Sequence, residues 1–193
     1  MAAAGADLAD EIGFSELTMA RLAERLGVRA PSLYKHIAGQ DDLHRRIAAL
    51  AFDEAGVAIG TAIQGRAGRD ALAAAAGALR DFVLTHPGRY AATLGVTLTG
   101  PDDPVALAAK RGIGPFGAVL RGYDIAPQEM THALRAVRSV FHGFAHLQAS
   151  GGFQWSADIG ESFEYLIDLV DRGLRSAVDT DSAAVAEPAD HHR

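Results

Sequence analysis

Apolar residues recur along this chain at intervals of three and four positions, the spacing that places them on one face of an α-helix. In the first segment, residues 2–12, Leu8 and Ile12 share such a face. No stretch alternates strictly between apolar and polar residues and ends in hairpin turns, which is the pattern typical of a half-buried strand. The periodicity therefore predicts an all-α fold.

Local signals near the N-terminus place two further helices and the turn between them. Thr18 is a typical N-cap for a helix over 19–26, and Gly27 can adopt the left-handed conformation that ends this helix. Pro31 suits the first turn of a short helix over 31–37, because a missing N–H costs nothing there. Two helices joined by a tight glycine turn make a helix-turn-helix.

Helical spacing continues beyond this unit. We expect Asp41 to cap a long fourth helix, and Pro115 with its neighbouring glycines to bend a later one. The expected helices cover residues 41–63, 70–85, 89–98, 104–121, 127–150 and 162–178. The remaining residues, 179–193, are typical of a flexible tail.

Charge is distributed unevenly along the chain, which has a formal net charge of −6. Between Leu17 and Arg46 there are six bases and three acids, whereas between Ala51 and Arg193 there are twelve bases and seventeen acids. The positive excess is thus confined to the helix-turn-helix and the residues that follow it. A local basic region of this kind is the electrostatic feature that nucleic-acid binding requires.

The chain contains no cysteine, which excludes disulfides, thiol catalysis and cysteine zinc sites. No uninterrupted apolar run is long enough to span a bilayer, and the acids near Met1 do not fit a signal peptide. We therefore expect a cytoplasmic protein with no membrane partner.

The helix that follows Gly27 has one apolar and one polar face. The residues expected to hold the two helices at a fixed angle are Leu22, Ala23, Leu26, Val28 and Leu33. The polar face offers a hydroxyl, a phenol, an ammonium and an imidazole, from Ser32, Tyr34, Lys35 and His36. These groups suit phosphate and base contacts by a helix in the major groove. The alternative is that this corner serves packing only and does not contact DNA. We expect Leu33 to be a core residue of this kind, and for His36 both interpretations stay open.

The stretch LTMARLAERLGVRAPSLYKHIAGQDDL, from Leu17 to Leu43, resembles the DNA-binding domain of the TetR family of transcriptional regulators. The matching positions are Thr18, Leu22, Ala23, Gly27, Val28, Pro31, Leu33, Tyr34, His36 and Leu43. The resemblance implies DNA contacts from Thr18, Pro31, Ser32, Tyr34, Lys35 and His36. The family usually has a lysine that holds a phosphate at the start of the fourth helix, where this chain has Gln40 followed by two aspartates.

The rest of the chain has about 140 residues, a size typical of a separate domain. We therefore expect a helix-turn-helix DNA-binding domain over 1–47, a helical ligand-binding and dimerisation domain over 48–178, and the tail over 179–193. Apolar stripes run along the last two helices, at Met130, Leu134, Val137, Phe141, Phe144 and Leu147, and at Phe163, Leu166, Ile167, Val170, Leu174 and Val178. Such stripes can pair with a second subunit as a four-helix bundle, or serve the core of a single chain.

The segment from Leu134 to Phe153 resembles a TetR subgroup that carries a His-Gly signature in its ligand domain, here His142-Gly143. A pocket for a small apolar effector is plausible among the middle helices. Candidate ligand-binding residues are Phe82, His86, Tyr90, Phe116, Leu120, Phe141 and His142. Taken singly, a residue of this kind more often belongs to the core than to a ligand site.

Two other patterns are weak signals for chemistry. His142 and His146 have the i, i+4 spacing of a zinc pair, but no third ligand is evident, so we expect no metal. The run GIGPFG at residues 112–117 formally matches a dinucleotide loop, yet it follows a helix and contains a proline, which favours helix packing. With no catalytic constellation and no cofactor motif, we expect that the protein is not an enzyme.

The function that these observations predict is a sequence-specific DNA-binding transcriptional regulator. The resemblance implies a homodimeric repressor that binds a palindromic site in double-stranded DNA and is released by a small molecule. The alternative is a helical ligand-binding protein with weakened DNA contact, because Gln40 and its acidic neighbours neutralise fewer phosphates than a lysine would.

Overall fold

The computed structural model describes residues 1–185, with side chains up to Ser176. This part of the chain contains nine α-helices, one 3₁₀ turn and no strand, so the all-α prediction is confirmed. The elements are α1 (Ala2–Ile12), η1 (Phe14–Glu16), α2 (Met19–Arg25), α3 (Ala30–Leu33), α4 (Gln40–Ala62), α5 (Gly68–Thr85), α6 (Pro87–Ala91), α7 (Pro104–Arg121), α8 (Met130–Ala149) and α9 (Ile159–Val185). None of the described helices is long and apolar enough to cross a membrane.

The start of the chain folds as the local signals predict. Helix α1 has the predicted bounds, and the Thr18 hydroxyl caps α2 by accepting the Arg21 N–H at 3.2 Å. Gly27 has a φ of 65°, the left-handed conformation that turns the chain from α2 toward α3. Leu22, Leu33 and Ala23 are buried and hold these two helices together.

Several predictions in this region are wrong in detail. Leu26 and Val28 are exposed, at 36% and 44%, because the Gly27 turn directs them away from the packed face of α2. Helix α3 ends at Leu33 and continues only as turns. The N-cap of α4 is Gly39, not Asp41; it is the Asp42 carboxylate that reaches back to accept the Ala38 N–H at 2.8 Å.

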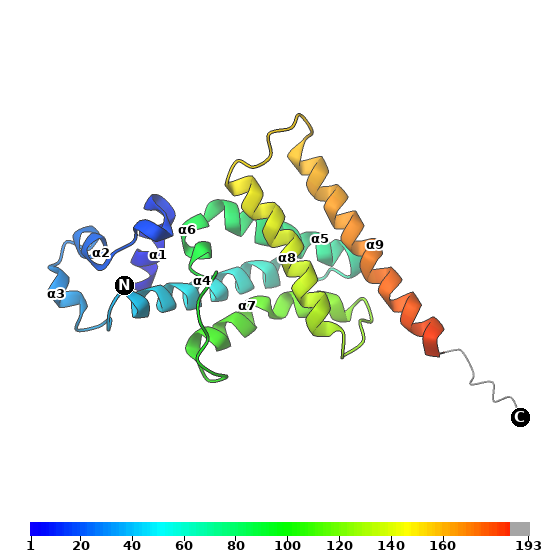
Figure 1. The fold of residues 1–193 in the computed structure, drawn as a ribbon, viewed down its shortest axis with the longest axis horizontal. Helices are drawn as coiled ribbons and strands as arrows, with labels where there is room; N and C mark the ends of the chain where they lie inside the picture. The colour runs from blue at the N-terminus through cyan, green and yellow to red at the C-terminus, as the bar shows by residue number, and fades with distance from the viewer. Residues whose placement is uncertain (186–193) are drawn as a thin grey trace, which may run out of the picture.

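Helix α4 runs from the helix-turn-helix into the larger helical part and packs lengthwise on α7 (Figure 1). Gly56 on α4 and Gly112 on α7 allow the backbones of these two helices to come into contact. A Cβ added to Gly112 would lie 2.6 Å from the Phe52 carbonyl oxygen, and one added to Gly56 would lie 2.9 Å from the Gly112 Cα. The GIGPFG run therefore serves helix packing, as expected, and Pro115 lies within a helix that continues to Arg121.

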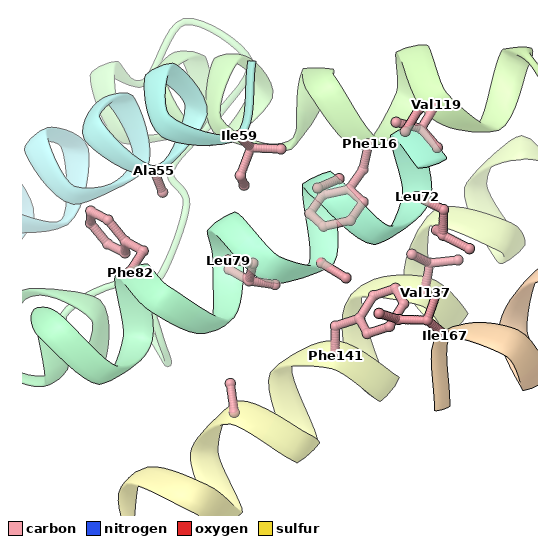
Figure 2. Close-up of a cluster of buried hydrophobic side chains, with 14 of the residues drawn as sticks. Ala55, Ile59, Leu72, Leu79, Phe82, Phe116, Val119, Val137, Phe141 and Ile167 are labelled. Atoms are coloured by element: carbon pink, nitrogen blue, oxygen red, sulfur yellow. The ribbon is translucent and has the colours of Figure 1, made fainter. Parts of the chain in front are cut away.

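Helices α4, α5, α7, α8 and α9 enclose the main core (Figure 2). Phe141 is fully buried at its centre, stacked on Phe116 with ring centroids 6.4 Å apart and edge-on to Phe163 at 6.0 Å. Helix α6 is shorter than the predicted 89–98, since it begins at Pro87 and ends at Ala91. Helix α9 continues to Val185, beyond the predicted end at Val178, and residues 186–193 of the expected tail lie outside the described residues.

Candidate nucleic-acid interface and effector cavity

The residues predicted to contact DNA lie on one corner of the molecule, formed by α2, α3 and the turn after α3 (Figure 1). Tyr34 is 56% exposed, and Lys35 and His36 are also exposed, while the neighbouring Leu33 and Ile37 are buried and anchor the segment. The two buried anchors flank the three exposed polar residues, so these side chains lie on the outer side of the segment. The corner can therefore present them together to a groove of DNA.

The other three predicted contact residues have local structural roles as well. Thr18 caps α2, and Pro31 occupies the first turn of α3. The Ser32 hydroxyl donates to the Arg29 carbonyl oxygen at 2.6 Å. Since Thr18 and Pro31 are exposed and Ser32 half-buried, all three remain at the surface of the same corner.

Most bases of the positive region are already paired within the chain. The ion pairs are Arg21 with Glu16, Arg25 with Glu11, Arg45 with Asp103, and Arg46 with Asp42. Among the described residues, Arg29 and Lys35 form no ion pair, and both are exposed at the corner. Arg29 was missed as a DNA-binding candidate, although its place directly before the Pro31 helix could have indicated it.

Gln40 joins the start of α4 to the start of α2. Its side-chain oxygen accepts the Met19 N–H at 3.0 Å, and its amide nitrogen donates to the Leu17 carbonyl oxygen at 2.7 Å. The side chain is thus held by the protein itself at the position where a lysine would hold a phosphate. These two hydrogen bonds connect the first residue of α4 to the start of α2.

A buried cation joins α1 to α6 and α4. The Arg89 Nε donates to Asp10 at 2.7 Å, one terminal nitrogen donates to Glu54 at 2.7 Å, and the other donates to Asp7. Burial opposes the charge, but the hydrogen bonds to Glu54 and Asp10 outweigh it, so the pKa of Arg89 lies above its usual value. His86, a predicted ligand contact, also lies at this junction, with its Nδ1 3.1 Å from Asp10.

A second junction ties α4 to the loop before α7. The Asp103 carboxylate accepts the Thr99 and Val105 N–H groups at 2.8 and 2.9 Å and receives Arg45 at 2.6 and 2.7 Å. The Thr99 hydrogen bond, followed by the Arg45 guanidinium, holds the pKa of Asp103 well below its ordinary value of 3.8. The two junctions fix the helix-turn-helix unit to the larger helical part.

A cavity of about 40 Å³ lies between α4, α5, α6, α7 and α8. Of the residues predicted to bind a ligand, Tyr90 and Phe116 line this cavity, and His142 contacts it through Tyr90, whose hydroxyl lies 2.9 Å from the His142 Nδ1. The others lie elsewhere: Phe82, Leu120 and Phe141 belong to the core, and His86 faces α1.

Two polar residues of the cavity wall were missed, Thr93 and Arg138. The Thr93 hydroxyl donates to the Tyr90 carbonyl oxygen at 2.7 Å. Arg138 lies one helical turn before His142 on α8, and that i, i+4 spacing could have pointed to it. Burial raises the pKa of Tyr90, and burial followed by the nearby His146 and Arg138 lowers the pKa of His142, so both groups are neutral near pH 7.

An exposed helix-turn-helix corner, joined by one continuous helix to a larger helical unit with its own cavity, defines a DNA-binding transcriptional regulator. Residues 2–47 match the family described as bacterial regulatory proteins, tetR family. Residues 72–170 match the tetracyclin repressor-like C-terminal domain. The chain therefore belongs to the TetR family, whose members are transcriptional regulators and not enzymes.

Known relatives agree with this assignment. The chain is 32% identical to the HTH-type transcriptional regulator YobS of Bacillus subtilis, over 89% of this chain and 88% of the relative. It is 37% identical to an HTH-type transcriptional regulator of Mycobacterium tuberculosis, over 74% of this chain but only 65% of that protein.

Solved structures agree on the fold. A Rhodococcus protein of unknown function aligns with a TM-score of 0.75 at 25% identity, covering 90% of this chain and 93% of its own. A possible TetR family regulator from Streptomyces coelicolor aligns with a TM-score of 0.69 at 25% identity, covering 91% and 97%.

Proposed function

We propose that the protein is a homodimeric repressor that binds a palindromic operator and is released from it by a small-molecule effector. The observation that carries this proposal is the corner formed by Tyr34, Lys35 and the unpaired Arg29, linked through α4 to the cavity. We further propose the domain limits 1–47 and 48–178, and membership of the subgroup with the His142-Gly143 signature.

The protein is released from its operator if the effector binds more tightly to a conformer that does not bind DNA. Helix α4 forms part of the cavity wall at Ala51 and Ala55 and begins at Gln40, which holds α2. A ligand larger than the cavity must displace part of its wall, and we propose that α4 moves, and with it the recognition corner. A small molecule shifts the equilibrium only as far as its affinities for the two conformers differ.

Lys35→Ala tests the DNA contact, because removing one phosphate contact weakens binding at all sequences and reduces the salt dependence. We expect the slope of log affinity against log salt to fall by about 1. Binding to a DNA fragment selected by the unmodified protein would be measured by fluorescence anisotropy over a series of salt concentrations.

Lys110→Ala is the matched control, since Lys110 is also an exposed lysine but lies on α7. It should leave both affinity and slope unchanged. Equal slopes for the two variants would show that Lys35 does not touch DNA. If no fragment is retained at low salt even by the unmodified protein, the alternative of a ligand-binding protein with weakened DNA contact is favoured, in keeping with the internal bonds of Gln40.

Support for the dimer comes from a second apolar face on the last two helices. Beyond the residues that α8 and α9 bury in the core, four large apolar side chains are exposed on the part of these helices whose side chains are described: Val140 at 36%, Leu147 at 51%, Tyr165 at 67% and Leu169 at 50%. Apolar surface on two neighbouring helices is the arrangement that a four-helix bundle between subunits uses.

Leu169→Asp should weaken subunit association by on the order of 2 kcal/mol, because it would bury an unpaired charge in the interface. Sedimentation velocity over a dilution series would then give a dissociation constant about 30-fold higher for this variant than for the unmodified protein. Val57→Asp is the control, as Val57 is an apolar residue on α4 that is 69% exposed. Equal dissociation constants for Leu169→Asp and the unmodified protein would place the interface elsewhere.

A further inference from the structure

The cavity between α4 and α8 has a mostly apolar and mostly buried wall. Ala51, Ala55, Ile59 and Phe116 supply its apolar surface, and all four are buried. The two lining residues that are only half-buried are Ile113 and Arg138, so the cavity reaches the surface beside them. An apolar interior with polar groups at one end favours an elongated ligand whose apolar body points inward.

Of the described residues that line the cavity, Arg138 alone carries a formal charge at pH 7, since the Tyr90 hydroxyl and the neighbouring His142 are neutral. Among the described residues, no carboxylate pairs with the Arg138 guanidinium and no hydrogen bond occupies it. Other arginines that tie helices together have such partners: Arg45 pairs with Asp103 and Arg89 with Asp10. The donors of Arg138 are therefore free at the mouth of the cavity.

We propose that the effector is a monocarboxylic acid with an apolar body. Its carboxylate pairs with Arg138, and its apolar body packs against the cavity wall formed by Ala51, Ala55, Ile59 and Phe116. This proposal rests on the proposed function and names the chemical class of its effector. An arginine can bind a carboxylate through two parallel N–H···O bonds. The pair lies at the half-buried rim, where part of the charge stays hydrated, so its desolvation cost is moderate.

The single positive charge of Arg138 also favours a monocarboxylate over ligands with other head groups. A phosphate ester carries close to two negative charges near pH 7, and the described wall offers one positive charge to balance them. An amine would place a second cation beside Arg138, and an alcohol would leave the guanidinium without a charged partner. The cavity itself has room for only a few waters, so the acid must widen it, and the proposed release requires that this widening displaces α4.

The test compares ligands that differ only in their head group. Straight-chain carboxylates from four to twelve carbons, with the alcohols and amines of the same lengths, would be titrated into the full chain by calorimetry. We expect the best carboxylate to bind about ten- to a hundredfold more tightly than its alcohol, the factor that a hydrogen bond to a charged group contributes, and the amines not to bind. If no carboxylate exceeds its alcohol, the proposal is overturned.

Arg138→Gln should remove the preference for the carboxylate and leave binding of the alcohol unchanged. Arg135→Gln is the matched control, an exposed arginine one turn earlier on α8 that does not line the cavity. An unchanged carboxylate preference in Arg138→Gln would contradict the proposal, and the head-group comparison in the unmodified protein decides the matter if this variant does not fold.

Operator binding, measured separately without ligand, distinguishes a failure of this inference from a failure of the proposed function. DNA binding that persists when no carboxylate is preferred overturns the ligand class alone. A carboxylate preference that depends on Arg138, in a protein that retains no DNA, supports the ligand class and contradicts the repressor.

Discussion

Gly88→Ala is expected to lower the free energy of unfolding by about 3 kcal/mol or more. A Cβ at residue 88 would collide with the Ala9 carbonyl group and lie 2.5 Å from the Asp10 backbone nitrogen. All of these are backbone atoms of α1, so no flexible side chain can move aside. Helix α6 would have to separate from α1, and urea denaturation followed by circular dichroism would measure the loss.

Gly77→Ala is the matched control for this substitution. Gly77 lies within α5, and a Cβ there would meet no atom within 4 Å. Because alanine loses less backbone entropy than glycine in a helix, this variant should be more stable by about 0.5–1 kcal/mol. Equal effects of the two substitutions would show that the close approach of α1 and α6 is absent in solution.

Arg89→Met is the second change with a large expected effect, a loss of about 3–5 kcal/mol of stability. The side chain is 9% exposed and binds Asp10, whose side chain is 13% exposed, as well as Glu54 and Asp7. Methionine fills a similar volume but leaves the half-buried Asp10 without its guanidinium partner. The midpoint of chemical denaturation at pH 7 gives the measurement.

Arg111→Met controls for the general loss of a surface charge. Arg111 pairs with Asp53, but the two side chains are 60% and 43% exposed, so the pair is hydrated on both sides. Exposed pairs of this kind contribute about 0–1 kcal/mol. An Arg89 variant as stable as the Arg111 variant would mean that the junction of α1, α4 and α6 contributes little to stability.

The parts of the fold that could be predicted from the sequence depend on near neighbours in the chain. Thr18, Gly27 and Pro31 each act within a few residues, through a cap, a left-handed turn and a first-turn proline. Their backbone requirements are the same in any context, so the helix-turn-helix could be placed before its packing was known. The exposed polar face of Tyr34 and Lys35 follows from the same local geometry.

The features that could not be predicted are contacts between residues far apart in the chain. Arg89 and Asp10 are brought together only when α6 packs on α1, and no periodic pattern marks either residue. Gln40 could be recognised as a departure from a lysine, but its bonds to Leu17 and Met19 depend on how α4 meets α2. Phe82 and Phe141 belong to the core, but their aromatic side chains alone do not show whether a residue lies in the core or lines the cavity.

The continuity of α4 has a mechanical consequence. At about 1.5 Å per residue, Gln40 lies about 28 Å along the helix axis from Ile59 in the cavity wall. In the release that we propose, α4 acts as a lever: a tilt of about 5° around Ile59 would carry Gln40, and with it the start of α2, through about 2.5 Å. In the proposed dimer both copies of α4 would tilt, so a change of a few degrees near the cavity would alter the spacing of the recognition helices by several ångströms.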